Sequence, residues 1–231
     1  MNGCIVPHIN KTNEAGMSII TIATSKGGAG KTTLAQVISG TIAARGHRVA
    51  AIDADYNHTL SDWVRTFETY PIDVHHELDE KKIIDLADTL EGRSELVVID
   101  TAGAAMQATV FAIGCADLVL VPCQLSSADV IEAAKTKQLV DSAARMTKRE
   151  IPVRAVLTDY QPGTHIARHV ETELEQCGLP LLATRLHRLV AFKEMTFNGQ
   201  VPRDGTAGAQ VAALVAELDG FGVVPPMKLA S

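Results

Sequence analysis

The sequence predicts an α/β fold in which a doubly wound, mainly parallel sheet has helices on both faces. Short apolar, β-branched runs alternate along the chain with longer helical patterns, as expected for strands that are buried on both sides. Of the residues, 46% are hydrophobic and only 4% aromatic, which suits Val/Ile/Leu strands covered by Ala-rich helices. Several of the strand-like runs end in Asp or in a glycine-rich segment. A chain of 231 residues is long enough for one domain of this class.

The first strand is expected to begin after residues 1–16, which we predict to be a disordered extension outside the fold. Met17 directly precedes the first apolar run, and the extension lacks the apolar core of a signal peptide. Residues 17–231 are then expected to form a single domain. No run is long and apolar enough to span a membrane, and the predicted location is the cytoplasm.

The apolar run at residues 19–22 leads directly into a glycine-rich loop and then a helix. Small residues in such a loop let backbone N–H groups approach phosphate oxygens, and the helix N-terminus favours negative charge. In a P-loop of this kind, Lys31 reaches the β- and γ-phosphates of a nucleotide and the Thr32 hydroxyl is a ligand of Mg²⁺. The predicted nucleotide-binding residues here are Lys26, Gly27, Gly28, Ala29, Gly30, Lys31, Thr32 and Thr33.

The later elements follow from apolar periodicity and from the glycines that end helices. Helices are predicted over residues 32–45, 60–68, 79–90, 129–146, 165–176 and 207–218. Strands are predicted over residues 47–53, 70–76, 95–100, 118–122, 153–158 and 181–185. Pro71 suits an edge strand. His75 and His76 are adjacent on that strand and therefore point to opposite faces, so we expect surface histidines rather than a shared metal site.

Two of the predicted strands end in carboxylates. One leads into Asp53-Ala54-Asp55, and residues 95–100 end in Asp100. Ligands of open parallel sheets bind beyond the carboxyl ends of the strands, so these acids are expected at the same site as the glycine loop. The structural alternative for Asp53 and Asp55 is an Asx-type turn after a strand.

The glycine loop departs from the strict P-loop pattern, because Ser25 stands where the first glycine belongs and Lys26 precedes the glycine pair. The resulting K-G-G-x-G-K-T pattern resembles the deviant P-loop of the ParA/MinD family of dimeric ATPases. The resemblance covers about residues 17–220 and fits the small ParA type that lacks an N-terminal DNA-binding domain, with VirC-type relatives included. Tyr56-Asn57 replaces the usual Pro-Gln after the D-x-D motif, and His187 replaces the usual proline near the base pocket.

The resemblance implies roles for individual residues. Lys26, Lys31 and Asp55 become the catalytic group: Lys26 contacts the phosphates of a partner subunit, and Asp55 positions or deprotonates the attacking water. Thr32, Asp53 and Asp100 become the Mg²⁺ group, with Asp100 at the end of a Walker B-like strand. Thr158 and Asp159 fall where the nucleotide base is bound. For Gly103, its position after the strand at residues 95–100 is the sole basis of the hypothesis that it offers a backbone amide to the γ-phosphate.

ATP and Mg²⁺ are the cofactors that the resemblance implies. The implied function is ATP-dependent homodimerisation and non-specific DNA binding coupled to slow ATP hydrolysis. Such a switch acts in plasmid or chromosome partitioning, in DNA transfer or in cargo positioning, with nucleoid association when ATP is bound. A ParB-like or other partner protein would stimulate hydrolysis.

Two alternatives remain open. The first is a MinD-like ATPase that acts on a membrane or protein surface; the helix predicted at 207–218 contains no Lys or Arg, so no membrane binding is expected through it. The second is a protein that uses ATP for dimerisation and barely hydrolyses it.

Basic residues cluster locally in a chain whose net charge is −6. Residues 135–154 contain six Lys or Arg against Asp141 and Glu150. This cluster is either a solvated helix face or a surface that contacts phosphates. The candidate DNA-binding residues are Lys135, Lys137, Arg145, Lys148, Arg149, Arg188, Lys193 and Arg203.

The four cysteines form no C-x-x-C pair and have no His neighbours at metal spacing, so buried free thiols are expected. Cys115 and Cys123 raise one rival hypothesis, because nitrogenase iron proteins share the deviant P-loop and hold a cluster with two cysteines. Their spacing, and the place of Cys123 directly after Pro122, fit that pattern poorly.

Overall fold

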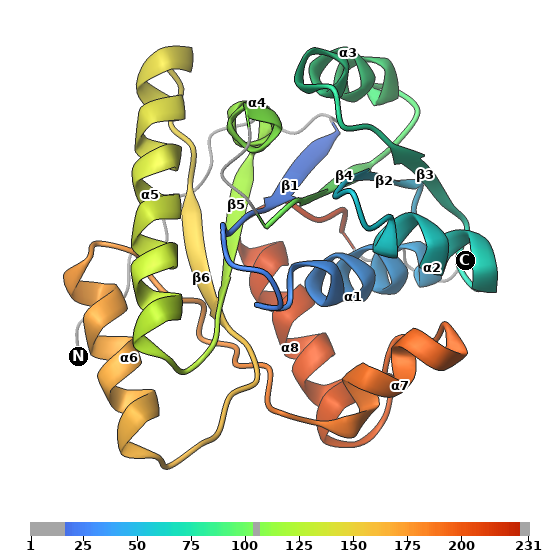
Figure 1. The fold of residues 1–231 in the computed structure, drawn as a ribbon. Coiled ribbons are helices and arrows are strands. Elements are labelled where there is room, and N and C mark those ends of the chain that lie inside the picture. Colours follow the sequence, from blue (N-terminus) through green and yellow to red (C-terminus); the bar gives the residue numbers. More distant parts are fainter. Residues whose placement is uncertain (1–16, 104–106, 227–231) are drawn as a thin grey trace.

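In the computed structural model, the residues described are 17–103 and 107–226, so the predicted extension at 1–16 lies outside them. Within these residues, one six-stranded sheet has the order β3-β2-β4-β1-β5-β6, and every pairing is parallel. This confirms the predicted doubly wound α/β fold (Figure 1). The strands are β1 (Ser18–Ile22), β2 (Val49–Ala54), β3 (Ile72–His76), β4 (Leu96–Thr101), β5 (Leu118–Cys123) and β6 (Val153–Leu157).

Helices cover both faces of the sheet (Figure 1). One face packs against α1 (Lys31–Ala44), α2 (Thr59–Phe67), α7 (Val190–Asn198) and α8 (Gly205–Gly220). The other packs against α3 (Glu80–Leu90), α4 (Gln107–Cys115), α5 (Ser127–Thr147) and α6 (His165–Gln176). The six helices predicted from periodicity lie within two residues of their expected ends. Periodicity did not predict helices α4 and α7.

The strand β4 illustrates why the central strands have continuous apolar runs. Leu96 and Val98 face the helices α1 and α8, while Val97 and Ile99 face α3 and α4. All four side chains are fully buried. Because side chains alternate between the two faces of a strand, only a sheet covered on both sides requires such a sequence.

Pro122 lies inside β5, where a proline is unusual in a central strand. The Val119 N–H donates to Pro152 O on the β6 side, so alternation places the Pro122 nitrogen on the β1 side. There β1 pairs with β5 only as far as Leu120, because the chain beyond Ile22 leaves the sheet. The proline therefore removes no ladder hydrogen bond.

The prediction of a last regular strand at residues 181–185 is wrong. This segment runs beside β6, with Leu182 N–H donating to Ala155 O and Leu186 N–H donating to Leu157 O. It forms only isolated bridges there. The Glu217 carboxylate of α8 accepts the N–H groups of Ala183 and Thr184, which would otherwise be free for a regular ladder. A side chain from a distant helix thus decides the local conformation.

The close approach of α1 to the segment that follows α7 depends on Gly40. A Cβ at this position would lie 2.7 Å from Val201 Cγ2 and 3.1 Å from Tyr70 Cε2. Tyr70 is itself fixed here, because its hydroxyl accepts the Val201 N–H at 3.0 Å. The neighbours of Gly40 therefore have little room to move.

We expect Gly40→Ala to lower the free energy of unfolding by about 1–3 kcal/mol through overpacking, although Ala normally favours a helix interior over Gly by about 1 kcal/mol. Gly114→Ala in α4 is the matched control, because its Cβ would meet only Thr147 Cγ2 at 3.7 Å. Urea unfolding curves measure both variants. Equal stability changes in the two would contradict this account of the α1 contact.

Candidate nucleotide-binding site

The parallel register brings the carboxyl ends of β1, β2 and β4 together. Asp53 on β2 pairs directly with Asp100 on β4, and Asp100 pairs with Ile22 at the end of β1. The glycine loop follows Ile22 and leads into α1. The structure therefore joins the predicted loop and the predicted acids at one edge of the sheet.

The loop has the backbone geometry of a phosphate cradle. Gly28 and Gly30 have φ values of 76° and 99°, a conformation that side-chain-bearing residues rarely adopt. Two residues outside the loop hold its carbonyls: Thr158 Oγ1 donates to Ala29 O at 2.8 Å, and Gln124 Nε2 donates to Gly28 O at 3.0 Å. Sequence reasoning missed Gln124, although its place directly after β5 puts it at the ligand edge.

Lys31 lies inside the loop that it is expected to serve. Its side chain is buried, and Nζ donates to Lys26 O at 3.0 Å. Burial lowers the pKa of Lys31, while the nearby Asp100 and Asp55 carboxylates raise it in part. The ammonium therefore stands between the loop backbone and the two acids.

Asp100 is a buried carboxylate with the Thr32 hydroxyl beside it as a hydrogen-bond donor, although neither oxygen has a hydrogen bond of standard geometry within the described residues. Burial is the main cause that raises its pKa to about 7; the Thr32 hydroxyl and the Lys31 charge lower the pKa, and the Asp53 and Asp55 charges raise it. A buried carboxylate with so little hydrogen bonding is costly in a protein interior. A cation beside Thr32 would compensate its charge, so Asp100 and Thr32 fit the predicted role of holding Mg²⁺.

Asp53 has hydrogen-bond partners within its own chain. Its Oδ1 accepts the Asp55 N–H at 3.1 Å, and its Oδ2 accepts the Ser61 N–H at 2.8 Å. The fully buried side chain thus ties the end of β2 to the first turn of α2. Asp53 therefore orients the segment that carries Asp55, and its supporting role for Mg²⁺ stays a prediction.

Asp55 faces a cavity of about 580 Å³ that the glycine loop, Tyr56 and Gly103 also line. Its Oδ1 accepts the Asn57 N–H and the Asn57 side-chain amide, each at 2.9 Å. The Asx-type turn considered from sequence is therefore present. The same turn presents the carboxylate to the cavity, so the two interpretations describe one structure.

Gly103 packs against the glycine loop. A Cβ at this position would lie 3.2 Å from Gly27 N and 3.3 Å from Gly27 Cα. The segment after β4 and the loop after β1 are thus in backbone contact, which is where the sequence placed a γ-phosphate-sensing amide.

A second cavity of about 380 Å³ adjoins the other side of the loop and is lined by Thr158, Asp159 and Phe192. Asp159 has a φ of 52°, and its carboxylate pairs with Arg188 at 3.2 Å. The Gln210 side chain of α8 accepts the His187 N–H, which fixes the segment that replaces the usual proline. Both predicted base-binding residues therefore line a cavity of suitable position.

Lys26 is bonded within its own chain. Its Nζ lies 2.5 Å from Asp129 Oδ2, and Asp129 also accepts the Ser126 hydroxyl. Ser25 similarly donates to Glu132. Sequence reasoning missed both acids, although the S-x-x-D spacing of Ser126 and Asp129 is a capping signal, and Ser126 does cap α5.

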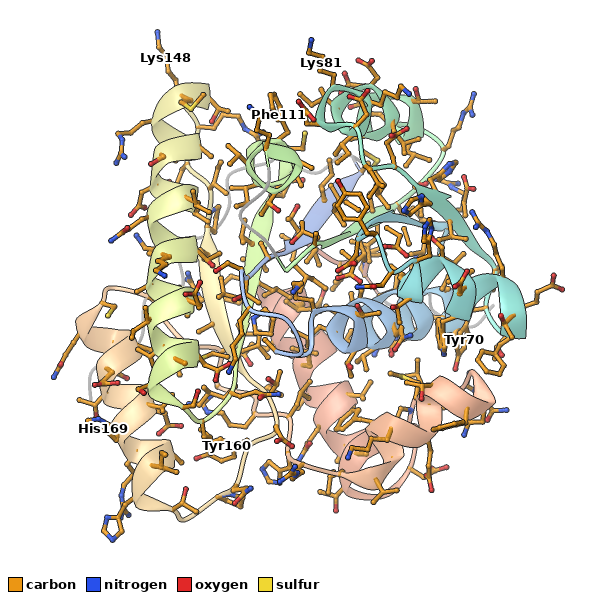
Figure 2. The ribbon with its side chains drawn as sticks, viewed as in Figure 1. Tyr70, Lys81, Phe111, Lys148, Tyr160 and His169 are labelled. Carbon is orange, nitrogen blue, oxygen red and sulfur yellow. The ribbon has the colours of Figure 1, made fainter. Side chains whose placement is uncertain are left out.

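The eight predicted DNA-binding residues do not share one surface. Lys135 and Lys137 on α5 pair with Glu132 and Asp141, each at 2.7 Å, and Arg149 pairs with Asp117. Arg145 donates to Ser142, and Lys148 points away from the far end of α5 (Figure 2). Arg188 and Lys193 line the base-side cavity, and Arg203 lies over the Tyr70 ring.

The iron-cluster alternative is wrong. Cys115 precedes β5 and Cys123 ends it, so the two thiols lie at opposite ends of a strand. Cys123 is buried, and burial raises the pKa of its thiol to about 12.

No helix among residues 17–103 and 107–226 has the length and apolarity to cross a membrane.

The deviant glycine loop, the acidic strand ends and the parallel sheet define a P-loop protein of the ParA/MinD class, in agreement with the family model and the curated relatives. More particularly, the chain belongs to the VirC1 protein family, because the model of that family matches residues 17–204.

Two curated relatives come from Rhizobium radiobacter. Protein ParA is 26% identical over 217 residues, covering 92% of this chain and 98% of the relative. Protein virC1 is 29% identical over 195 residues, covering 80% of this chain and 83% of the relative. Among solved structures, the ATP complex of a substituted McdA from Cyanothece has a TM-score of 0.74 at 15% identity, covering 92% of this chain and 99% of McdA.

Asp100 predicts an unusual pH dependence of stability. Its pKa in the fold, about 7, lies above its ordinary value of 3.8. The contribution of Asp100 to stability is therefore full below pH 4 and is lost as the pH rises through 7, because the folded chain must then bury its charge. Without nucleotide and Mg²⁺, we expect Asp100→Asn to raise the free energy of unfolding at pH 8 by about 1–3 kcal/mol, with little change at pH 4. Thermal melts at both pH values test this, and an Asn variant that is less stable at pH 8 would contradict it.

Gly103 gives a second prediction. We expect Gly103→Ala to weaken ATP binding at least about tenfold, because the new Cβ displaces the Gly27 backbone from the phosphate cradle. Isothermal titration calorimetry measures the binding, and Gly220→Ala, whose Cβ would meet no atom within 4 Å, is the control for a glycine outside the site. Unchanged affinity in Gly103→Ala would separate this glycine from the nucleotide.

Proposed function

We propose that this chain is a switch that binds ATP with Mg²⁺, dimerises and hydrolyses ATP slowly. The observation that carries the proposal is the buried Asp100 carboxylate, which has no hydrogen bond of standard geometry within the described residues and lies near Thr32 and Lys31 of the glycine cradle. The glycine cradle and Lys31 suit the negative phosphates of a nucleoside triphosphate, and the Asp100 carboxylate suits the cation that accompanies them. Within residues 17–103 and 107–226, no group of three or more His, Cys, Asp or Glu is placed to hold a metal alone. Phosphate oxygens would therefore complete the coordination of Mg²⁺.

The residues of the site divide the chemistry among them. Bound Mg²⁺ would neutralise phosphate charge, with Thr32 and Asp100 holding it. Lys31 stabilises negative charge that develops on the transferred phosphoryl group, where positioning and electrostatics provide most of the rate. Asp55 lies across the same cavity and orients the attacking water. Thr158 and Asp159 receive the base in the adjoining cavity.

Dimerisation depends in this proposal on release of Lys26. The Lys26 side chain reaches the phosphates of a second subunit only after it leaves Asp129, whose carboxylate is 2% exposed. The γ-phosphate of the second subunit would offer Lys26 more negative charge than Asp129 does. The contact with Asp129 therefore sets how much ATP is needed for dimerisation.

For the ATP-bound dimer, we propose non-specific DNA binding and a role in DNA partitioning or DNA transfer, with a ParB-like or other partner that stimulates hydrolysis. The relatives named ParA and virC1 support this assignment. Dimerisation doubles any basic surface, so contacts too weak in one subunit become effective in two. Lys148, Arg145 and Lys193 form no ion pair with a carboxylate among the described residues and are the first candidates for DNA contacts.

A second candidate is positioning of a protein cargo, without DNA. The observation in its favour is the pairing of Lys135, Lys137 and Arg149 with carboxylates. These ion pairs make the surface around α5 less basic than its Lys and Arg content alone suggests. A relative from Halothiobacillus neapolitanus, maintenance of carboxysome distribution protein A, is 28% identical over 187 residues, covering 78% of this chain and 84% of the relative. In this case ATP would drive dimerisation with no affinity for DNA.

The test compares wild type, Lys26→Gln and Asp129→Asn with no nucleotide, ADP, ATP and a non-hydrolysable ATP analogue. We expect wild type to dimerise and bind unrelated duplexes only with ATP or the analogue, and the binding to weaken steeply with salt. Lys26→Gln should do neither. Asp129→Asn should dimerise at a several-fold lower ATP concentration, because Lys26 is already released. Light scattering measures dimerisation, and fluorescence anisotropy measures DNA binding.

Lys82→Gln, which removes a surface lysine on α3, is the control for loss of one charge. ATP-driven dimerisation without DNA affinity would support the second candidate. A dimer formed equally well by Lys26→Gln would contradict the role of Lys26.

A further inference from the structure

Two histidine rings lie beside Asp55, and one of them, His76, is a residue that the sequence predicts to lie at the surface. His76 ends the edge strand β3, and its Nε2 lies 3.2 Å from the Asp55 carbonyl oxygen. The His58 ring lies against the His76 ring, with centroids 3.7 Å apart and planes tilted by 37°. His58 is far from His76 in sequence, so only the fold brings the two rings together.

The contact begins where the backbone ladder between β2 and β3 ends. Asp53 pairs with His76 in the ladder, and the last bond runs from Glu77 N–H to Asp53 O at 3.1 Å. Ala54 still pairs with Thr101 on β4, and beyond it the chain leaves the sheet towards the cavity. The His76 side chain therefore connects β3 to the carbonyl of Asp55, two residues beyond the last backbone pairing of β2 with β3.

The turn that carries Asp55 also has its own bonds. His58 N–H donates to Asp55 O at 3.2 Å, and the Asp55 N–H donates to Asp53. His58 adopts a left-handed conformation with a φ of 54° and starts α2, because its carbonyl accepts the Asp62 N–H. The turn thus has closing bonds without His76, and what His76 adds is an anchor to the rigid sheet.

We propose that His76, supported by the stacked His58 ring, is a positioning residue that holds Asp55 for ATP hydrolysis. The inference rests on the proposed function, in which Asp55 orients the water. A catalytic carboxylate must be held within a fraction of an ångström of its productive place. The Asp55 carboxylate lies on an exposed turn whose tip, Tyr56, is 59% exposed, so its precision has to come from anchors of this kind.

Three substitutions of His76 separate its contributions. His76→Phe keeps a ring beside His58 and loses the N–H donor, His76→Gln keeps a donor and loses the ring, and His76→Ala loses both. His75→Ala is the matched control, because His75 is the neighbour on the opposite face and pairs with Asp73 on its own strand. Single-turnover and steady-state assays give kcat and KM for ATP.

We expect kcat to fall about tenfold or more in His76→Phe and His76→Ala, and His76→Gln to recover to within about threefold of wild type. KM and the melting temperature should change little, because the cradle and the turn remain. His75→Ala should behave as wild type.

Asp55→Ala and Asp55→Ala/His76→Phe complete the test. If His76 acts through Asp55, His76→Phe causes no further loss in the Asp55→Ala background. A further loss there, or wild-type kcat in all His76 variants while Asp55→Ala is slow, would overturn the inference and leave the proposed function standing. Wild-type hydrolysis by Asp55→Ala would instead overturn the role that the proposed function gives to Asp55. A wild-type chain that binds ATP without hydrolysing it would overturn both.

Discussion

The site depends on one constraint, the parallel register of β2, β4 and β1. This register places Asp53 opposite Asp100 and ends β1 beside them, so the glycine loop starts where the two acids lie. The same register buries the Asp100 carboxylate, which has the Thr32 hydroxyl beside it but no hydrogen bond of standard geometry within the described residues. Such a group destabilises the fold by itself. It is the clearest physical sign that this edge of the sheet is built to receive a cation.

The groups proposed to act on ATP are held by the chain's own residues. Lys31 donates to the Lys26 carbonyl, Lys26 pairs with Asp129, and the Asp55 carboxylate accepts two hydrogen bonds from Asn57. The partners come from α5 and from the turn after β2 as well as from the loop. A ligand at this site therefore competes with intrachain contacts in several elements at once, and its binding energy can be converted into rearrangement of those elements.

Much of the fold and of the site follows from local sequence. Apolar runs located the strands, glycines located the helix ends, and the K-G-G-x-G-K-T loop located the phosphate cradle. The positions of Asp53, Asp55 and Asp100 at strand ends followed from the same pattern. These features are predictable because strand burial, helix capping and phosphate binding each require particular residues at short spacing.

The tertiary structure decided what depends on residues distant in sequence. Glu217 binds the backbone of residues 183–184 in the segment predicted as a last strand, and Asp53 accepts two backbone N–H groups of its own chain. Asp129 holds Lys26, and His58 meets His76 beside Asp55. The sequence by itself determined which chemistry the chain carries. Only the packing of separate elements determined which partner each polar group has, because hydrogen bonds and ion pairs form between neighbours in space.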